Sequence, residues 1–275
     1  MMAPSTEQAW KPLVAQLERV TTRKGRQQTG FFSIEGIRLH ERAFRAGYAP
    51  TQVLLSASLF STTSERVQQL LAALQAAGSD LIVAPDDEVA ALTKGRQLGA
   101  MLGLLPLPAS ISLAQVVAAV DVPLLLVAAD VVDPGNVGAL MRTGHASGIT
   151  AFIAVGVSDS YHPRAVQTSR GSLFKLPLLQ YDTLDVLRQD LQALKIGMVG
   201  TAVTDGTLLP QTTFTRRGTA VFMGNEYWGL QPDVIASLDT RITIPMAAGV
   251  DSYAVNAAAA IVLYEIQRQW GLNQA

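Results

Sequence analysis

The strongest constraint on the fold is a series of short apolar runs in the second half of the chain. The runs are four to six residues long and hold few polar side chains. A strand with one solvated face alternates apolar and polar residues, whereas a strand covered on both faces is apolar almost throughout, as in a parallel sheet. Segments with helical spacing separate the runs. The pattern predicts an open parallel α/β sheet with strands at 124–129, 151–155, 197–201, 220–223 and 241–244, and helices at 137–147, 183–194, 232–238 and 254–270.

The first half of the chain predicts a second, smaller α/β domain, because strand-like and helical segments alternate there too. We expect strands at 31–34, 53–59, 81–84 and 102–107, and helices at 9–22, 36–47, 64–77 and 86–94. The polar, glycine-bearing segment 23–30 is predicted to be a loop. Pro106, Pro108 and Pro123 bracket a region with one small helix at most. The predicted organisation is a domain at 1–112, a linker at 113–122 and a domain at 123–275.

Composition excludes several classes of protein. With 49% hydrophobic residues, the 275-residue chain can bury a sizeable core and is not disordered. It has no cysteine and three histidines, so it forms no disulfide and we expect no metal site. The chain does not begin like a signal peptide, and no apolar run reaches the roughly 18 residues of a membrane span. We therefore expect a cytoplasmic protein that does not contact membranes.

Charge is distributed unevenly along the chain. Residues 1–48 contain eight basic and four acidic side chains, although the formal net charge of the whole chain is −1. A basic segment on a mildly acidic body is typical of a face that binds a polyanion. Ordinary solvated surface charge explains the same numbers equally well.

Ligands of open α/β sheets bind at the carboxyl ends of the strands, and three predicted loops there carry unusual residues. In the first, Asn136 can cap a helix on which Gly138, Arg142 and His145 share one stripe. A capped helix with a surface arginine is the alternative interpretation, and a helix-surface position is favoured for His145. The dinucleotide fingerprint G-x-G-x-x-G is absent.

The second loop follows an apolar strand directly with Gly224-Asn225-Glu226, which places polar groups at the sheet edge. Glycine there permits close approach of the backbone to a ligand, although a simple turn is the alternative. In the third loop, Ser252 suits the cap of an alanine-rich helix. The small residues at 247–249 expose backbone groups that can recognise an adenine edge.

Together the three loops resemble the motifs of the SpoU/TrmH family of RNA 2′-O-ribose methyltransferases. They read Asn136-x-Gly138-x-x-x-Arg142, then Gly224-Asn225-Glu226-x-x-Gly229-Leu230, then Ile244-Pro245-Met246 through Ser252. Their order and spacing agree with the family over about residues 123–270. The first half resembles the substrate-binding domain often attached in this family, from Arg23-Lys24 through Gly30-Phe31-Phe32 to Glu35-Gly36-Ile37-Arg38.

The resemblance implies a trefoil-knotted parallel sheet of the SPOUT type, bound S-adenosylmethionine and a homodimer with the final helix in its interface. It implies four catalytic residues, namely Asn136, Arg142, Glu226 and Ser252. The cofactor-binding residues that it implies are Thr201, Ala202, Met223, Gly224, Ile244, Pro245, Met246, Ser252 and Tyr253. The RNA-binding side chains of the first domain are expected to be Arg23, Lys24, Arg26 and Arg38.

Physical chemistry constrains the roles that the resemblance implies. Arginine stays protonated, so we expect Arg142 to clamp an RNA phosphate and stabilise the developing alkoxide. Action of Arg142 as the base remains the alternative. Glu226 is expected to orient Asn136 or Arg142 rather than to bind a metal. One position departs from the family, because Ala254 stands where asparagine is usual and Asn256 follows two residues later.

The function predicted is therefore transfer of a methyl group to a ribose 2′-hydroxyl of RNA, with ribosomal RNA favoured over transfer RNA. A resistance enzyme that protects ribosomal RNA is a special case of the same chemistry. The departure at Ala254 keeps open a non-catalytic RNA-binding protein on this scaffold. Tyr227 and Trp228 either pack over the cofactor loop or stack on a base, and packing is favoured. A nucleotide-dependent oxidoreductase fails on the missing fingerprint.

Overall fold

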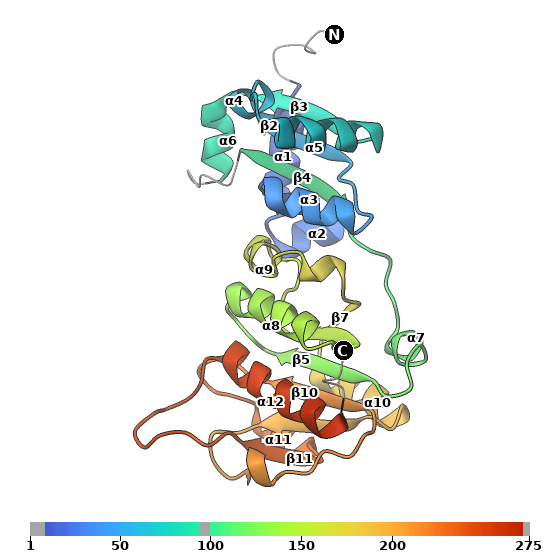
Figure 1. Ribbon diagram of the computed structural model, residues 1–275, viewed down its shortest axis with the longest axis vertical. Helices are drawn as coiled ribbons and strands as arrows, with labels where there is room; N and C mark the ends of the chain where they lie inside the picture. The colour runs from blue at the N-terminus through green and yellow to red at the C-terminus, as the bar shows by residue number, and fades with distance from the viewer. Residues whose placement is uncertain (1–8, 94–99, 272–275) are drawn as a thin grey trace. The chain divides into compact units, whose positions relative to one another are not determined.

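The computed structural model describes residues 9–93 and 100–271. It divides the chain into two compact units, one of residues 1–109 with 161–167 and the other of residues 110–160 with 168–275. The helices and strands of the first unit are α1 Lys11–Arg19, α2 Arg23–Thr29, β1 Phe31–Glu35, α3 Ile37–Arg45, β2 Gln52–Ser56, α4 Ala57–Phe60, α5 Glu65–Ala76, β3 Asp80–Ala84, α6 Asp86–Leu92 and β4 Met101–Pro106 (Figure 1). Residue 94, predicted to end a helix, lies outside the described residues.

The sheet of the first unit has the order β1-β4-β2-β3, in which only the β2–β3 pair is parallel. Helix α1 and the sheet bury one apolar cluster, whose members include Leu17, Leu54 and Leu104. The other face is covered by α5, where Leu71 and Leu74 pack with Val53 and Leu55 of β2. Alternate residues of β2 thus face opposite cores, as the pleat of a strand requires.

The prediction that residues 23–30 form a loop is wrong, because they form α2. Thr22 caps this helix by accepting a hydrogen bond from the Gly25 N–H at 3.0 Å, and Gly30 ends it in the left-handed region at φ 74°. Gly25 also lies so close to the Arg19 carbonyl oxygen that a Cβ would be 1.8 Å from it. Polarity and glycine content favour a loop, but the Thr22 cap and the left-handed Gly30 delimit a helix instead.

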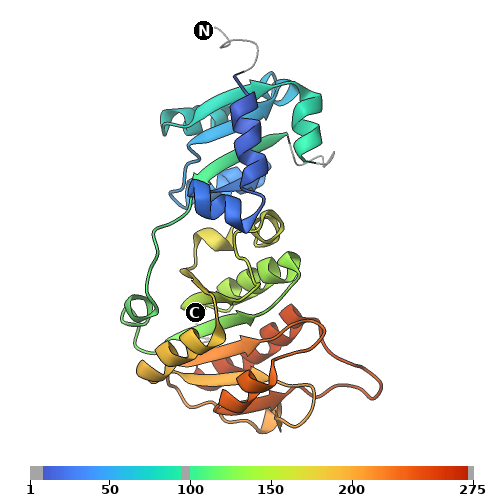
Figure 2. The same ribbon diagram turned by 180° about the vertical axis from the view of Figure 1, so that it is seen from behind.

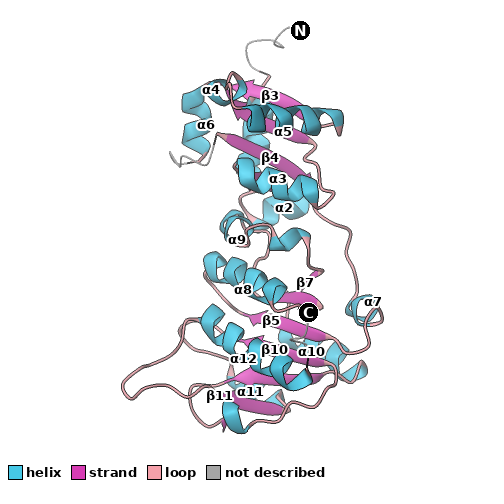
Figure 3. Cartoon of the chain, in the orientation of Figure 1, coloured by secondary structure: helices cyan, strands magenta, loops and turns pink. Residues whose placement is uncertain are grey.

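The second unit contains α7 Leu113–Val117, β5 Leu124–Ala129, α8 Pro134–Ala146, β6 Ala151–Val155, η1 Ser172–Phe174, β7 Leu178–Tyr181, α10 Leu184–Ala193, β8 Gly197–Thr201, β9 Thr207–Leu208, η2 Leu209–Gln211, β10 Thr219–Met223, α11 Pro232–Ser237, β11 Thr240–Thr243 and α12 Val255–Trp270 (Figure 3). Helix α7 lies in the segment predicted as a linker, and its Leu113 and Val116 join the core of this unit. Helix α9, Pro163–Thr168, follows β6 in sequence but belongs to the first unit except for its last residue.

The sheet of the second unit is parallel throughout, in the order β7-β6-β5-β10-β8-β11-β9. Leu125, Val127 and Ala129 of β5 pack with α7, α10 and α11 on one face. Leu126 points to the other face toward Gly144 of α8, and α8 lies beside α12 (Figures 1 and 2). The predicted α/β class and parallel sheet are confirmed, and burial on both faces explains the apolar runs. The knot stays a prediction.

Candidate active site at the carboxyl edge of the parallel sheet

The three motif loops follow β5, β10 and β11, whose carboxyl ends lie at the same edge of the sheet, with β8 between β10 and β11. In the register of the sheet, Met223 of β10 lies opposite Ala128 of β5, and Phe222 lies opposite Gly200 of β8. On the far side of β8, Ile242 of β11 pairs with Thr201. Because all of these strands are parallel, the residues that follow them emerge together, although up to about a hundred positions separate them in sequence.

The carboxylate of Glu226 joins the first two loops. Its Oε1 accepts hydrogen bonds from the Asp133 N–H at 3.2 Å and the Asn136 Nδ2 at 2.9 Å, and its Oε2 accepts one from the Val132 N–H at 3.1 Å. Three donors converge on one ionised group, and hydrogen bonds to a charged acceptor are the stronger kind. Glu226 therefore fixes both the backbone of the β5–α8 loop and the orientation of the Asn136 side chain.

Asn225 organises the turn that carries Glu226. Its side chain is buried, donates from Nδ2 to the Asp130 carbonyl oxygen at 3.0 Å, and accepts at Oδ1 from the N–H groups of Tyr227 and Trp228. The backbone of Asn225 pairs with that of Gly229 in both directions at 2.9 Å. This closure requires glycine at 224, where a Cβ would lie 2.3 Å from the Gly229 carbonyl carbon.

Sequence reasoning missed two residues that hold the neighbouring strand ends together. Asp130 follows β5 with a positive φ of 54°, and its Oδ1 accepts from the Val157 N–H at 3.3 Å. Ser158 is fully buried, and its Oγ accepts from the Val131 N–H at 2.8 Å. The available signal was a polar residue just beyond an apolar run, directly after β5 for Asp130 and three residues after β6 for Ser158.

The structure changes the expected roles on α8. Asp133, not Asn136, is the N-cap, because the Asp133 Oδ1 accepts from the Gly135 N–H at 2.6 Å. Asn136 therefore lies inside the first turn, where its amide is free to reach Glu226. Arg142 is exposed two turns further along, and the exposed His145 places its Nδ1 3.2 Å from the Ser172 Oγ. Gly138 is buried.

The third motif forms a long loop between β11 and α12 (Figure 1). The prediction that Ser252 caps the following helix is wrong, because α12 begins at Val255 and its N-cap is Ala254. Ser252, Tyr253 and Ala254 are all exposed, while Asn256 lies in the first turn of α12 and is half-buried. The loop therefore offers the Ser252 hydroxyl to a ligand and not to the helix.

Uncharged residues occupy every position predicted for the cofactor. Met223 and Gly224 are buried, whereas Thr201, Ala202, Ile244 and Met246 are half-buried and Pro245 is exposed. The residues at 247–250 are exposed, so their backbone groups and the apolar Ile244 and Met246 side chains are both available to a ligand. A nucleoside with an apolar ring face and a polar ring edge fits this chemistry.

One predicted RNA-binding residue does not fit that role. Arg26 is only 2% exposed, and its guanidinium donates to the carbonyl oxygens of Val20 and Thr21 at 2.9 and 3.1 Å. These carbonyls lie just beyond the end of α1, so Arg26 holds α2 against it. Lys24 and Arg38 are exposed, and Arg23 is half-buried.

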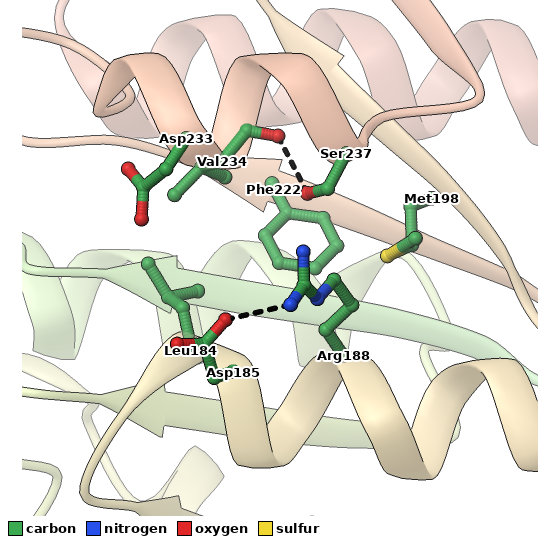
Figure 4. Close-up of a pocket in the computed structure, with 8 residues that line it drawn as sticks. All are labelled: Leu184, Asp185, Arg188, Met198, Phe222, Asp233, Val234 and Ser237. Atoms are coloured by element: carbon green, nitrogen blue, oxygen red, sulfur yellow. Dashed lines mark hydrogen bonds and ion pairs between the residues drawn. The ribbon is translucent and has the colours of Figure 1, made fainter.

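A small pocket lies on the opposite face of the sheet from α8 (Figure 4). It is lined by residues of α10, α11, β8 and β10, namely Leu184, Asp185, Arg188, Met198, Phe222, Asp233, Val234 and Ser237. Asp185 and Arg188 form an ion pair of 2.9 Å at its rim. It includes none of the predicted site residues, and we assign it no role.

Within residues 9–93 and 100–271, no group of three or more histidine, aspartate or glutamate side chains could hold a metal ion. Among the helices of those ranges, none is long and apolar enough to cross a membrane.

Residues 123–264 match the SpoU rRNA Methylase family, and residues 11–97 match the MRM3-like substrate binding domain. The protein named 23S rRNA (guanosine-2′-O-)-methyltransferase RlmB of Yersinia pestis is 32% identical over 222 residues, which cover 76% of this chain and 86% of that protein. The 23S rRNA (guanosine(2553)-2′-O)-methyltransferase RlmP of Bacillus subtilis is 24% identical over 95% of this chain and 98% of its own length.

Solved structures are similar over almost the whole chain. The SpoU methyltransferase AviRb from Streptomyces viridochromogenes, in complex with AdoMet, aligns with a TM-score of 0.83 at 25% identity, covering 95% of this chain and 99% of that one. A structure described as an RNA 2′-O ribose methyltransferase aligns with a TM-score of 0.76 at 27% identity, covering 98% and 99%.

Proposed function

This chain belongs to the SpoU rRNA methylase family, and we propose that it transfers a methyl group from S-adenosylmethionine to a ribose 2′-hydroxyl of ribosomal RNA. The family predicted from the three motifs is confirmed, as is the substrate-binding domain in the first half. The ribosomal target is supported by the names of the relatives, which are 23S rRNA methyltransferases. The observation that carries the proposal is the Glu226 carboxylate of the second motif holding Asn136 of the first motif at the carboxyl edge of the parallel sheet.

The cofactor would be held by the loops after β8, β10 and β11. The residues are Thr201, Ala202, Met223, Gly224, Ile244, Pro245, Met246, Ser252 and Tyr253. When bound, S-adenosylmethionine supplies a methyl group on a sulfonium, which is electrophilic without a metal ion. Because no side chain in this set is charged at neutral pH, the chain recognises the cofactor through backbone groups and apolar contacts.

The protein's own residues prepare the ribose for attack. Arg142, exposed on α8, binds an RNA phosphate and stabilises the charge that develops on the 2′-oxygen. Asn136, held by Glu226, keeps its remaining amide hydrogen and carbonyl oxygen for the substrate. Ser252 contributes its exposed hydroxyl from the third loop. Catalysis by these groups is positioning and electrostatic stabilisation, and the proton that the 2′-hydroxyl loses passes to solvent water.

The first unit captures the RNA through Arg23, Lys24 and Arg38. We leave out Arg26 because its guanidinium is already bound to backbone carbonyls. The protein acts as a homodimer through α12, whose outer side exposes Tyr264 next to a run of alanines from 257 to 260. Sedimentation of the purified protein tests the dimer independently of activity.

The proposal is tested in two steps. Calorimetric titration with S-adenosylmethionine and S-adenosylhomocysteine should show saturable binding. Transfer of a tritiated methyl group to 23S rRNA transcribed in vitro should then yield a 2′-O-methylated nucleotide after digestion. Binding of RNA without any transfer would instead support the non-catalytic scaffold, and transfer to tRNA alone would correct the substrate.

A further inference from the structure

Two large aromatic side chains lie uncovered beside the proposed active site. Tyr227 is 80% exposed and Trp228 is 76% exposed, more than any other large hydrophobic residue in the described part of the chain. They directly follow Glu226, whose carboxylate holds Asn136. The expectation that packing covers these two rings is therefore wrong for this chain.

The turn that carries the rings does not need aromatic residues. Asn225 Oδ1 binds the backbone N–H groups of both residues, at 2.8 Å for Tyr227 and 3.3 Å for Trp228. Gly229 closes the turn with a positive φ of 68° and two backbone hydrogen bonds to Asn225. None of these contacts uses the side chain of residue 227 or 228, so polar side chains would fit the same turn without exposing apolar surface.

The two rings leave aromatic surface open to a ligand. Their centroids are 6.1 Å apart and their planes are tilted by 51°, so they do not stack on each other. Two apolar residues at neighbouring strand ends are exposed as well, Val132 by 56% and Val157 by 60%. The Val132 N–H donates to the Glu226 carboxylate, which places this apolar surface at the same edge as the Glu226–Asn136 pair.

We propose that Tyr227 and Trp228 form a platform on which an unpaired RNA base stacks, at or next to the nucleotide that is methylated. The inference rests on the proposed function. A base offers a flat π-face to an aromatic ring, and proteins recognise unpaired RNA bases in this way. A second copy of the chain is the competing occupant. It is disfavoured because the dimer proposed above uses α12, whereas the rings lie in the turn between β10 and α11.

Tryptophan fluorescence can report on RNA binding at Trp228. Of the three tryptophans, Trp270 is buried and Trp10 is half-buried, so Trp228 is the one open to solvent. A short single-stranded RNA of mixed sequence should quench its emission, and the difference from Trp228→Phe gives the Trp228 signal alone. Trp228→Leu should bind this RNA about 10- to 100-fold more weakly, whereas Trp228→Phe should stay near wild type.

Controls separate stacking from general damage. Trp228→Leu keeps apolar area without a π-face, and its affinity for S-adenosylmethionine and its melting temperature should not change. Phe60→Leu, which removes an aromatic ring that is 48% exposed on α4, should leave RNA binding unchanged. In the methylation assay, the KM of Trp228→Leu for RNA should rise by more than its kcat falls.

Two results would overturn the platform. One is wild-type RNA affinity in Trp228→Leu together with no quenching. The other is wild-type tryptophan emission that changes with protein concentration in the absence of RNA, together with a shift of Trp228→Leu to monomer. In that case a second copy of the chain covers the rings. A wild type that binds RNA through Trp228 but transfers no methyl group refutes the proposed function and leaves the platform intact. If Trp228→Leu transfers methyl groups normally and its KM for RNA is unchanged, the platform is refuted and the proposed function stands.

Discussion

Replacement of Glu226 by glutamine tests the link between the second motif and the first. The glutamine oxygen can keep the two hydrogen bonds that Oε1 now accepts, from the Asp133 N–H and from Asn136. The glutamine NH₂ group then faces the Val132 N–H, which loses its acceptor. One charge-assisted hydrogen bond is lost, which is worth about 1.5–3 kcal/mol.

The loss should appear as slower turnover. If the whole 1.5–3 kcal/mol falls on the transition state, kcat drops by about 10- to 150-fold. Glu226→Ala removes all three acceptor contacts and frees the Asn136 amide, so it should lose more activity than Glu226→Gln. The measurement is kcat and KM for tritiated methyl transfer to 23S rRNA, with the dissociation constant for S-adenosylmethionine measured separately.

Asp185→Asn is the matched control. It removes one carboxylate charge from the same unit, at an ion pair with Arg188 on the face of the sheet opposite α8. That carboxylate is 71% exposed, and exposed pairs contribute at most about 1 kcal/mol, so turnover should be unchanged. If Glu226→Gln keeps kcat within about twofold of wild type, the Glu226 charge does not position Asn136 for catalysis and the reasoning fails.

Three other predictions concern single features. Arg142→Ala should lower kcat by about 10²- to 10³-fold and leave S-adenosylmethionine affinity near wild type; a large loss of cofactor affinity would contradict the phosphate-clamp role. Changing Arg23, Lys24 and Arg38 together to glutamate should weaken RNA binding. The slope of log K against log salt concentration should fall in magnitude by about 2, at roughly 0.7 per phosphate contact. An unchanged slope would mean that RNA binds to another surface. Burial lowers the pKa of His40 to about 4 from 6.5, so the unfolded chain takes up the proton first. Stability is therefore full above pH 6.5 and falls by about 3 kcal/mol toward pH 4, and urea unfolding of His40→Gln should lack this part of the pH dependence.

The sequence alone determined the class of the second unit, and it supplied the three segments that we propose as its site. Four of the five predicted runs became β5, β6, β8 and β10 because burial on both faces demands apolar residues at almost every position. The fifth became β11, in which only Ile242 is buried and Arg241 is exposed. Two strands escaped this reasoning. Strand β7 is only partly buried at the sheet edge, and β9 is a two-residue edge strand with both residues exposed. Edge strands lack the continuous apolar signal.

Local hydrogen bonds could not be predicted from the polarity of the residues alone. The segment 23–30 is polar because only Gly25 and Arg26 in α2 are buried, and the cap at Thr22 sets where the helix begins. Arg26 was predicted to bind RNA because it is a basic residue in a polar segment. Its actual partners are buried backbone carbonyls, which no pattern of side chains reveals. Similarly, Asp133 and Asn136 are both good helix caps by type, and only the structure shows which one takes that role.

The tertiary structure decided how the motifs act on one another. Glu226 lies 90 residues from Asn136 in sequence, and only the pairing of β10 with β5 brings its carboxylate to the amide. The exposure of Tyr227 and Trp228 was equally undecided by the sequence, because an aromatic pair after a strand suits a core as well as a surface. Residue type determines which chemistry a position can supply, whereas burial and hydrogen-bond partners depend on strand order, which long-range packing sets.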